Sequence, residues 1–358
     1  MLYYLLYPLY EQFIGFNVIR YITFRTFMAV FTAMFIYFYF GNRFIAYLSK
    51  KQFWQTVRDD GPVSHMDKRG TPTMGGILLW ISVFVSIFLW SKFLESFVLI
   101  AVGLVTMFGL IGFIDDYRKI VLRDPKGLRA RWKLPLQLIC AAVVALILFD
   151  VIGLSETLTV PFFKKFMPNL GWAYIPFAVL VMVGASNAVN LTDGLDGLVS
   201  VPSMVAFLAF AILAYIASHA SIASYLAVEH VPGSGELAVM CGAVVGACTG
   251  FLWFNAHPAS IFMGDVGSLP LGALLGYVAV VTKHEILLIL IGGIFVMETI
   301  SVITQVISFK LTGKRVFEMA PIHHHFELKG WAESKVIVRF WIISIILALV
   351  SLATLKLR

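Results

Sequence analysis

Charge is scarce in this sequence. Of its 358 residues, 13% are Asp, Glu, Lys or Arg, whereas 60% are hydrophobic. Soluble domains carry about 25% charged residues, so this composition excludes an ordinary globular protein in water. Long polar segments are lacking as well, because the polar stretches between apolar runs reach only about 35 residues, which is shorter than an independent domain. The chain is therefore predicted to be one membrane domain over 1–358.

Cysteine is scarce as well, and the first residues are not expected to form a cleavable leader. Cys241 and Cys248 fall in one apolar run, about 10 Å apart along a helix axis, which is too far for a disulfide. Cys140 lies in another apolar run, and redox chemistry is not expected. The first 20 residues lack a basic start and an A-x-A site, so they do not resemble a removable signal peptide. Glu11 within them favours a segment at the membrane interface.

What the sequence has in abundance is apolar runs of the length that crosses a bilayer. About ten can be distinguished, at 22–40, 75–91, 97–114, 134–153, 172–189, 198–218, 237–254, 266–281, 286–308 and 337–355. This pattern predicts an all-α polytopic membrane protein with about ten transmembrane helices.

Basic residues predict the orientation of these helices. Of the 27 Lys and Arg residues, 18 fall in the loops after the first, third and ninth runs. Cytoplasmic loops are rich in Lys and Arg, so the odd-numbered loops are predicted to be cytoplasmic and both termini to lie outside the cell. The formal net charge of +7 then reflects topology and attraction to anionic headgroups. No nucleic-acid partner is expected.

The five predicted cytoplasmic loops contain nearly all the unusual polar residues, whereas the opposite loops contain ordinary turn residues. The five clusters are Lys68 to Gly76, Asp115 to Lys119, Asn187 to Gly197, Asn255 to Asp265 and Pro321 to Trp331. Their presence on one membrane face predicts an active site that faces the cytoplasm.

Each acidic cluster has a structural alternative. Asp115 and Asp116 end a predicted helix, where carboxylates oppose the helix dipole, so they are either a solvated terminus compensated by Arg118 and Lys119 or a cation site. Asp265 precedes another helix and is either a cap or a metal ligand. The segment 193–197 lacks the alternating ligands of a calcium loop. Its two glycines and two carboxylates indicate a tight turn, plain or suited to a sugar or nucleobase.

Two further features carry histidines or polar residues. Adjacent residues such as His323, His324 and His325 cannot all face one ion, and the cysteines are distant, so imidazoles that contact phosphate are favoured over zinc ligands or a purely structural triplet. Glu298 and Gln305 share one face of a predicted span. Glu298 there has either a functional role or a role in helix packing.

Carboxylates, basic residues and glycine turns at a membrane surface are suited to phosphoryl transfer. Carboxylates hold Mg²⁺, and the metal and basic groups neutralise charge as a phosphorus centre is displaced. A nucleotide donor would come from the cytoplasm and a lipid acceptor from the bilayer. No G-x-x-x-x-G-K-[ST] pattern is present, which disfavours an ATP-driven pump.

Five stretches, one from each loop, carry a family resemblance: KRGTPTMGG (68–76), GFIDDYRK (112–119), NAVNLTDGLDGL (187–198), FLWFNAHPASIFMGDVGSL (251–269) and APIHHHFELKGW (320–331). In this order, over essentially the whole chain, they resemble the phospho-N-acetylmuramoyl-pentapeptide transferases of the polyprenyl-phosphate N-acetylhexosamine-1-phosphate transferase superfamily. The last stretch is typical of the muramoyl-pentapeptide branch. The segment 256–260 departs from the family pattern, in which a Thr or Ala and a Tyr are expected there.

The resemblance implies an enzyme of peptidoglycan synthesis, and so of cell wall biogenesis, cell shape and division. It would transfer phospho-MurNAc-pentapeptide from UDP-MurNAc-pentapeptide to undecaprenyl phosphate in the bacterial inner membrane, forming lipid I and releasing UMP. A Mg²⁺ requirement and a homodimer are implied too. The implied metal site is Asp265 with Asp115 and Asp116. These three are also the implied catalytic residues, together with His323 and His324. The implied substrate-binding residues are Lys68, Thr73, Asn190, Asp193, Asp196, Asn255, Phe262, Gln305 and His325.

Two mechanisms fit the implied reaction. Asp115 attacks the donor as a nucleophile, or the lipid phosphate attacks directly. A phosphate monoester is already mostly dianionic at pH 7, so it has little need of a base, and direct attack is favoured. The nearest rival function is a sister transferase that uses UDP-GlcNAc. A lipid flippase or transporter is a second rival, although the inverted repeats typical of transporters are not evident.

Overall fold

The computed structural model describes residues 1–54, 70–124, 126–161, 163 and 166–357, and in these residues the regular secondary structure is helical. The elements are α1 (Leu2–Leu6), η1 (Tyr7–Glu11), η2 (Ile14–Arg20), α2 (Ile22–Lys50), α3 (Gly76–Trp90), α4 (Ser96–Ile120), α5 (Ala130–Leu146), η4 (Ile147–Val151), η5 (Gly171–Ala173), α6 (Tyr174–Thr192), α7 (Ser200–Ser218), α8 (Ala220–Leu226), α9 (Gly235–Asn255), α10 (Asp265–Val281), α11 (Glu285–Ile291), α12 (Gly293–Thr312), α13 (Ile322–Leu328), α14 (Glu333–Ala353) and η6 (Thr354–Leu357).

Eight of the described helical segments are long and apolar enough to cross a membrane, and α3 and α10 are shorter apolar helices. Each predicted apolar run corresponds to one of these segments, so the prediction of an all-α polytopic membrane protein is confirmed. The boundaries differ at several places. Helix α2 continues to Lys50, and the predicted run 286–308 is divided at Gly292 into α11 and α12. Helix α12 ends at Thr312, and the next residue, Gly313, has a φ of 70° that suits glycine.

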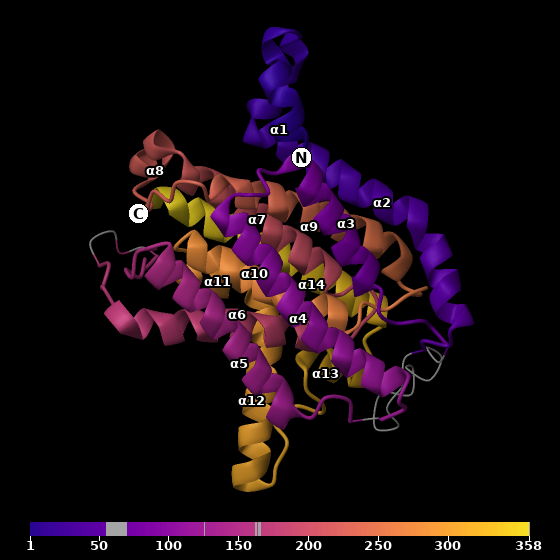
Figure 1. The fold of residues 1–358 in the computed structure, drawn as a ribbon. Helices are drawn as coiled ribbons and strands as arrows, with labels where there is room; N and C mark the ends of the chain where they lie inside the picture. The colour runs from indigo at the N-terminus through magenta and orange to yellow at the C-terminus, as the bar shows by residue number, and fades with distance from the viewer. Residues whose placement is uncertain (55–69, 125, 162, 164–165, 358) are drawn as a thin grey trace.

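The helices pack through small residues, as is usual within membranes. The longest interface joins α2 to α9. At Gly246 of α9, a Cβ atom would lie 2.1 Å from the carbonyl oxygen of Val30, so the two backbones touch there. Helix α10 is buried over nearly its whole length and contacts α3, α4 and α6. It therefore forms the centre of the bundle, as Figure 1 shows.

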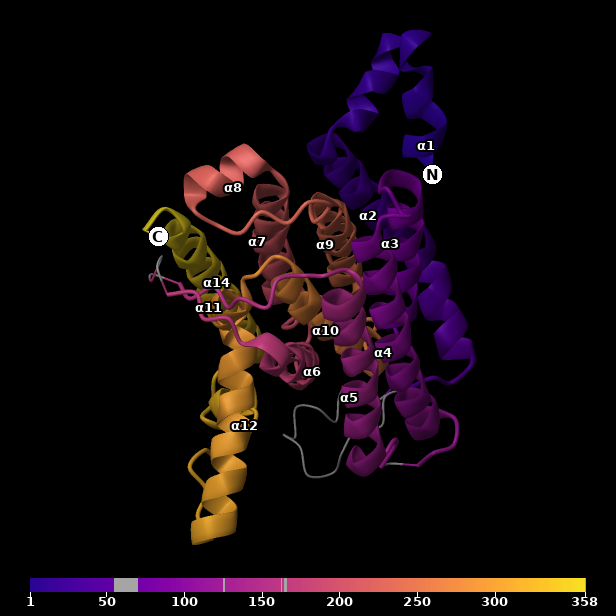
Figure 2. The same ribbon diagram turned by 60° about the vertical axis from the view of Figure 1, so that its left-hand side comes forward.

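Short helical pieces project from both ends of the bundle. Residues 1–20 form α1, η1 and η2, which project beyond the other helices at the upper end in Figures 1 and 2, while α1 still contacts α3. The end of α12 projects at the opposite, lower end. The N-terminal pieces are too short to span a bilayer, in agreement with the prediction that residues 1–20 are not a full span.

The end of the bundle that carries α8, here the α8 end, buries charged side chains in pairs. Arg25 donates two hydrogen bonds to the carboxylate of Glu236, at 2.6 and 2.7 Å, and the backbone N–H of Lys92 adds a third. These contacts connect α2, α9 and the α3–α4 loop. After α10, the ammonium of Lys283 donates to the carbonyl of Ser155 at 2.7 Å. Burial lowers the pKa of Lys283 to about 7.

Candidate active site

Three carboxylates meet at the end of the bundle opposite α8, here the acidic end. Oxygens of Asp115, Asp116 and Asp265 all lie within 4.8 Å of one another. Gly112 makes this possible, because a Cβ there would lie 2.2 Å from the carbonyl oxygen of Asp265. The absence of a side chain lets the end of α4 touch the start of α10. Asp116 then accepts a hydrogen bond of 2.9 Å from the N–H of Val266 in the first turn of α10, where a negative charge is favoured.

Two lysines neutralise part of this negative charge. Lys133 of α5 lies 2.6 Å from Oδ2 of Asp265 and 3.7 Å from Asp115. Lys119 forms ion pairs with Asp115, four residues earlier on the same helix, and with Asp265. From the sequence, Lys119 is expected only to compensate charge at a helix end, and Lys133 is not singled out. The spacing of four residues from Asp115 could have identified Lys119. No local pattern distinguishes Lys133 from the other basic residues among the seven in its loop.

Helix α6 adds an amide to the acidic end. Nδ2 of Asn190 donates to Oδ1 of Asp265 at 2.7 Å and to the hydroxyl of Ser268 at 2.8 Å. Asp193 follows the end of α6. Burial and the nearby charge of Asp265 raise the pKa of Asp193 to about 7. Asn190 therefore lies against Asp265, and Asp193 lies near enough to be affected by its charge. The substrate-binding role of both residues stays a prediction.

The donor set at the acidic end suits a hard divalent cation. Asp115, Asp116 and Asp265 offer carboxylate oxygens only, which Mg²⁺ and Ca²⁺ prefer over the nitrogen and sulfur ligands typical of zinc. Three carboxylates face two ammonium groups, Lys119 and Lys133. The remaining negative charge and the mutual repulsion of the carboxylates favour a bound cation.

A glycine turn lies next to the histidine helix α13. His323 is fully buried, and its Nδ1 lies 3.0 Å from Oε1 of Glu298 on α12. Its Nε2 points at Gly194, where a Cβ atom would lie only 2.3 Å away. His324 pairs with Glu327 at 2.9 Å, and Nδ1 of His325 accepts the N–H of Glu318 at 3.1 Å. The three histidines therefore point to three different partners.

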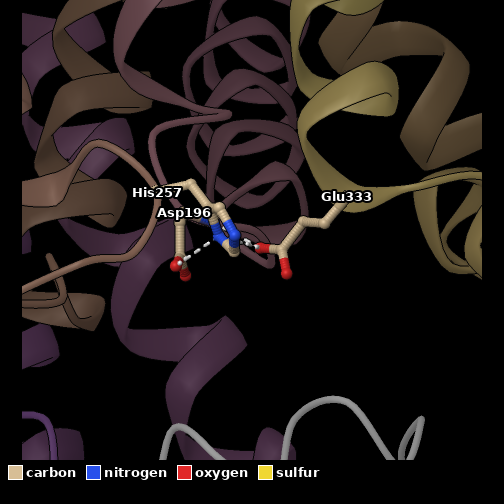
Figure 3. Close-up of side chains that lie close together, drawn as sticks. All are labelled: Asp196, His257 and Glu333. Atoms are coloured by element: carbon tan, nitrogen blue, oxygen red, sulfur yellow. Dashed lines mark hydrogen bonds and ion pairs between the residues drawn. The ribbon is translucent and has the colours of Figure 1, made fainter.

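The second half of the same turn meets the loop after α9, as Figure 3 shows. Nδ1 of His257 lies 3.1 Å from Asp196 and 3.8 Å from Glu333, which begins α14. Asp196 also accepts the N–H of Ala259 at 3.0 Å. These three side chains are close enough to share an ion, but the contacts also account for the cluster as a junction between three loops. His257, from the segment that departs from the family pattern, is part of this cluster.

Other predicted substrate-binding residues hold loops in place. Asn255 accepts the N–H of Gly197 and donates to the carbonyl of Ile261. Gln305 accepts two backbone N–H groups and donates to the carbonyl of Phe317. Thr73 is buried, and the N–H of Phe262 donates to the carbonyl of Pro72, which joins the first and fourth loops. Lys68 lies outside the described residues.

The comparisons with known proteins agree with this geometry. Residues 98–283 match the model of glycosyl transferase family 4. The fold and the acidic end thus belong to a membrane glycosyl transferase. Residues 68–78 match signature 1 of phospho-N-acetylmuramoyl-pentapeptide-transferase. Proteins with that name are 52% identical in Citrifermentans bemidjiense, 53% in Geobacter sp. strain M21 and 56% in Desulfatibacillum aliphaticivorans, each over 100% of both chains. The chain therefore belongs to the phospho-N-acetylmuramoyl-pentapeptide-transferase family.

Proposed function

We propose that this protein transfers phospho-MurNAc-pentapeptide from UDP-MurNAc-pentapeptide to undecaprenyl phosphate, which forms lipid I and releases UMP in peptidoglycan synthesis. The observation that carries this proposal is the meeting of Asp115, Asp116 and Asp265 with two lysines at one end of an apolar helical bundle. Such a site brings a charged, water-soluble donor to the edge of the bilayer, where a lipid phosphate is available. Family membership supports the same reaction.

Mg²⁺ is the proposed cofactor, held by Asp265 with Asp115 and Asp116 nearby. When bound, it would neutralise charge on the diphosphate of the donor. The ammonium groups of Lys119 and Lys133 add positive charge next to the same carboxylates. Asn190 keeps Asp265 in a fixed orientation through its hydrogen bond of 2.7 Å. Catalysis would then rest on positioning and electrostatic stabilisation, which dominate phosphoryl transfer.

We further propose direct attack by the lipid phosphate. Oδ1 of Asp115 accepts the N–H of Leu128 at 2.6 Å, and its other oxygen pairs with Lys119. A carboxylate held in this way is suited to a positioning role. A nucleophilic Asp115 would allow labelled UMP to exchange into the donor without any lipid. Direct attack predicts no such exchange in rigorously delipidated enzyme, and robust exchange would overturn it.

A product assay tests the reaction itself. Purified protein with Mg²⁺, radiolabelled UDP-MurNAc-pentapeptide and undecaprenyl phosphate should yield a butanol-extractable labelled lipid and free UMP. The matched control replaces the donor with UDP-GlcNAc, which a sister transferase would use. A protein that moves lipid across vesicles but forms no labelled product would instead be a transporter, and the proposal would be wrong.

We propose that the acidic end faces the cytoplasm of the inner membrane, that both termini lie outside, and that the protein forms a homodimer. The basic residues near Lys126 support this orientation. A cysteine introduced at Lys126 should react with an impermeant thiol reagent only after cells are opened. Labelling in intact cells would reverse the orientation and the side from which the donor arrives.

A further inference from the structure

Glu298 is the one acidic residue of α12, and it is fully buried. Both of its carboxylate oxygens are used by the next loop: Oε2 accepts the N–H of Ile322 at 2.8 Å, and Oε1 lies 3.0 Å from Nδ1 of His323. A buried carboxylate is retained where it has specific partners. Here the partners are the first two residues of α13, so Glu298 determines where that helix begins and how its first histidine is oriented.

The carboxylate also determines which nitrogen of His323 carries a proton. An ionised carboxylate only accepts hydrogen bonds, so Nδ1 must be the donor. In the neutral ring Nε2 is then an unprotonated acceptor. Carboxylate–histidine pairs control tautomer and basicity in this way in many enzymes.

Nε2 of His323 is buried and lacks a hydrogen-bond partner among the described residues. It faces Gly194, in the turn that links Asp193 to Asp196, and only a glycine leaves room for the ring there. An unsatisfied buried polar atom in a native site calls for an explanation, and a ligand that supplies the missing partner is one. This nitrogen adjoins the turn that is proposed to bind substrate.

We propose that Glu298 is a positioning residue: it holds His323 as the Nδ1–H tautomer, so that Nε2 is presented beneath the Gly194 turn for interaction with the nucleotide donor. This inference rests on the proposed function and extends it to a residue within a membrane-spanning helix. Glu298 itself does not touch the substrate. Its effect on turnover passes through His323.

Glu298→Gln tests the tautomer directly. The single carbonyl oxygen of Gln can accept from Ile322, which turns its NH₂ group towards Nδ1 and favours the Nε2–H tautomer. The ¹⁵N spectrum of histidine-labelled protein, with His323 assigned by its loss in His323→Asn, should show a protonated Nδ1 in the wild type and a protonated Nε2 in the variant. A wild-type ring with bare Nδ1 would overturn the proposal. This readout needs no activity, so it stands apart from the substrate assignment.

A double-mutant cycle tests whether Glu298 affects turnover through His323. Glu298→Gln should lower kcat/KM for the donor about 10- to 100-fold, the range for residues that orient a functional histidine. In the His323→Asn background the same change should cost less than about twofold, because no ring is left to orient. If the reductions in kcat/KM of the two single variants multiplied in the double variant, Glu298 would act independently of His323, and the proposal would be refuted.

The matched control is Ser301→Ala. Ser301 lies one turn along the same face of α12, is buried like Glu298, and donates its hydroxyl only to the carbonyl of residue 298. Its kcat/KM should stay within about twofold of wild type. If Glu298→Gln unfolds the protein, Glu298→Asp keeps the charge and should retain the Nδ1–H signal. Loss of that signal in a folded Asp variant would count against the proposal.

Discussion

The two ends of the helical bundle both bury charge, but they balance it differently. At the α8 end, Arg25 and Glu236 form a bidentate salt bridge whose side chains are 1% and 5% exposed. At the acidic end, three carboxylates face Lys119 and Lys133. The first arrangement is matched charge for charge, whereas the second keeps an excess of carboxylate.

The difference separates a structural use of charge from a chemical one. A matched buried pair has few further interactions to offer, and its removal leaves an unpaired charge that destabilises the fold. A group of carboxylates with too few cations is destabilised by its own repulsion and is relieved when a metal or a cationic partner binds. We therefore expect mutations at the α8 end to alter stability and mutations at the acidic end to alter turnover. Four predictions test this division.

The largest effect is expected for Glu236→Gln. The variant leaves the buried guanidinium of Arg25 without its counter-charge, which should lower the free energy of unfolding by about 3–5 kcal/mol. Turnover per folded molecule should stay within about twofold of wild type. Denaturant unfolding in detergent and the lipid product assay measure the two quantities. The double variant Arg25→Met with Glu236→Leu should recover most of the stability, because no charge remains buried.

Asp265→Asn should do the reverse of Glu236→Gln: it should lower turnover and leave stability nearly unchanged. The amide keeps the shape but removes a charge that is proposed to hold Mg²⁺, so Mg²⁺-dependent turnover should fall at least about 100-fold, the scale of a lost electrostatic contribution. The thermal midpoint should change little. Activity within a few-fold of wild type at saturating Mg²⁺ would mean that Asp265 serves only as the first residue of α10.

Lys133→Gln should reduce turnover by about 10- to 100-fold, since a charge-assisted hydrogen bond contributes about 1.5–3 kcal/mol. Lys126 is the matched control, because it belongs to the same loop and its backbone N–H bonds to the half-buried Asp124 rather than to Asp115, Asp116 or Asp265. Steady-state kinetics of Lys126→Gln should match wild type. Equal losses in both variants would attribute the effect to the loop's overall charge.

The smallest effect concerns pH at the α8 end. Burial lowers the pKa of Lys283 to about 7, against about 10.4 in an unfolded chain. Between these values the unfolded state binds more protons, so stability should rise with pH by up to about 1.4 kcal/mol per unit from pH 7 to 9. Lys283→Met should reduce this slope, measured as thermal midpoints at pH 7, 8 and 9. An unchanged slope would contradict the lowered pKa.

Much of the site could be predicted because its residues stand in short motifs at the ends of apolar runs. Asp115, Asp116 and Asp265 were expected to lie together, and they do. Lys133 could not be predicted, since only the packing of α5 selects it from the basic residues of its loop. Asn255 and Gln305 were expected to bind substrate, and that role stays a prediction. In the structure their amides hold neighbouring loops.

The number of spans, their order and the loops in which polar residues gather all follow from the amino-acid sequence alone. These are local properties, because a segment in lipid must satisfy its own backbone hydrogen bonds as a helix. Tertiary structure decided which side chains face one another. Gly112 and Gly194 illustrate this, because the lack of a Cβ at each matters only through a neighbour distant in sequence, Asp265 in one case and His323 in the other. Such contacts depend on how the helices pack, and no local pattern encodes them.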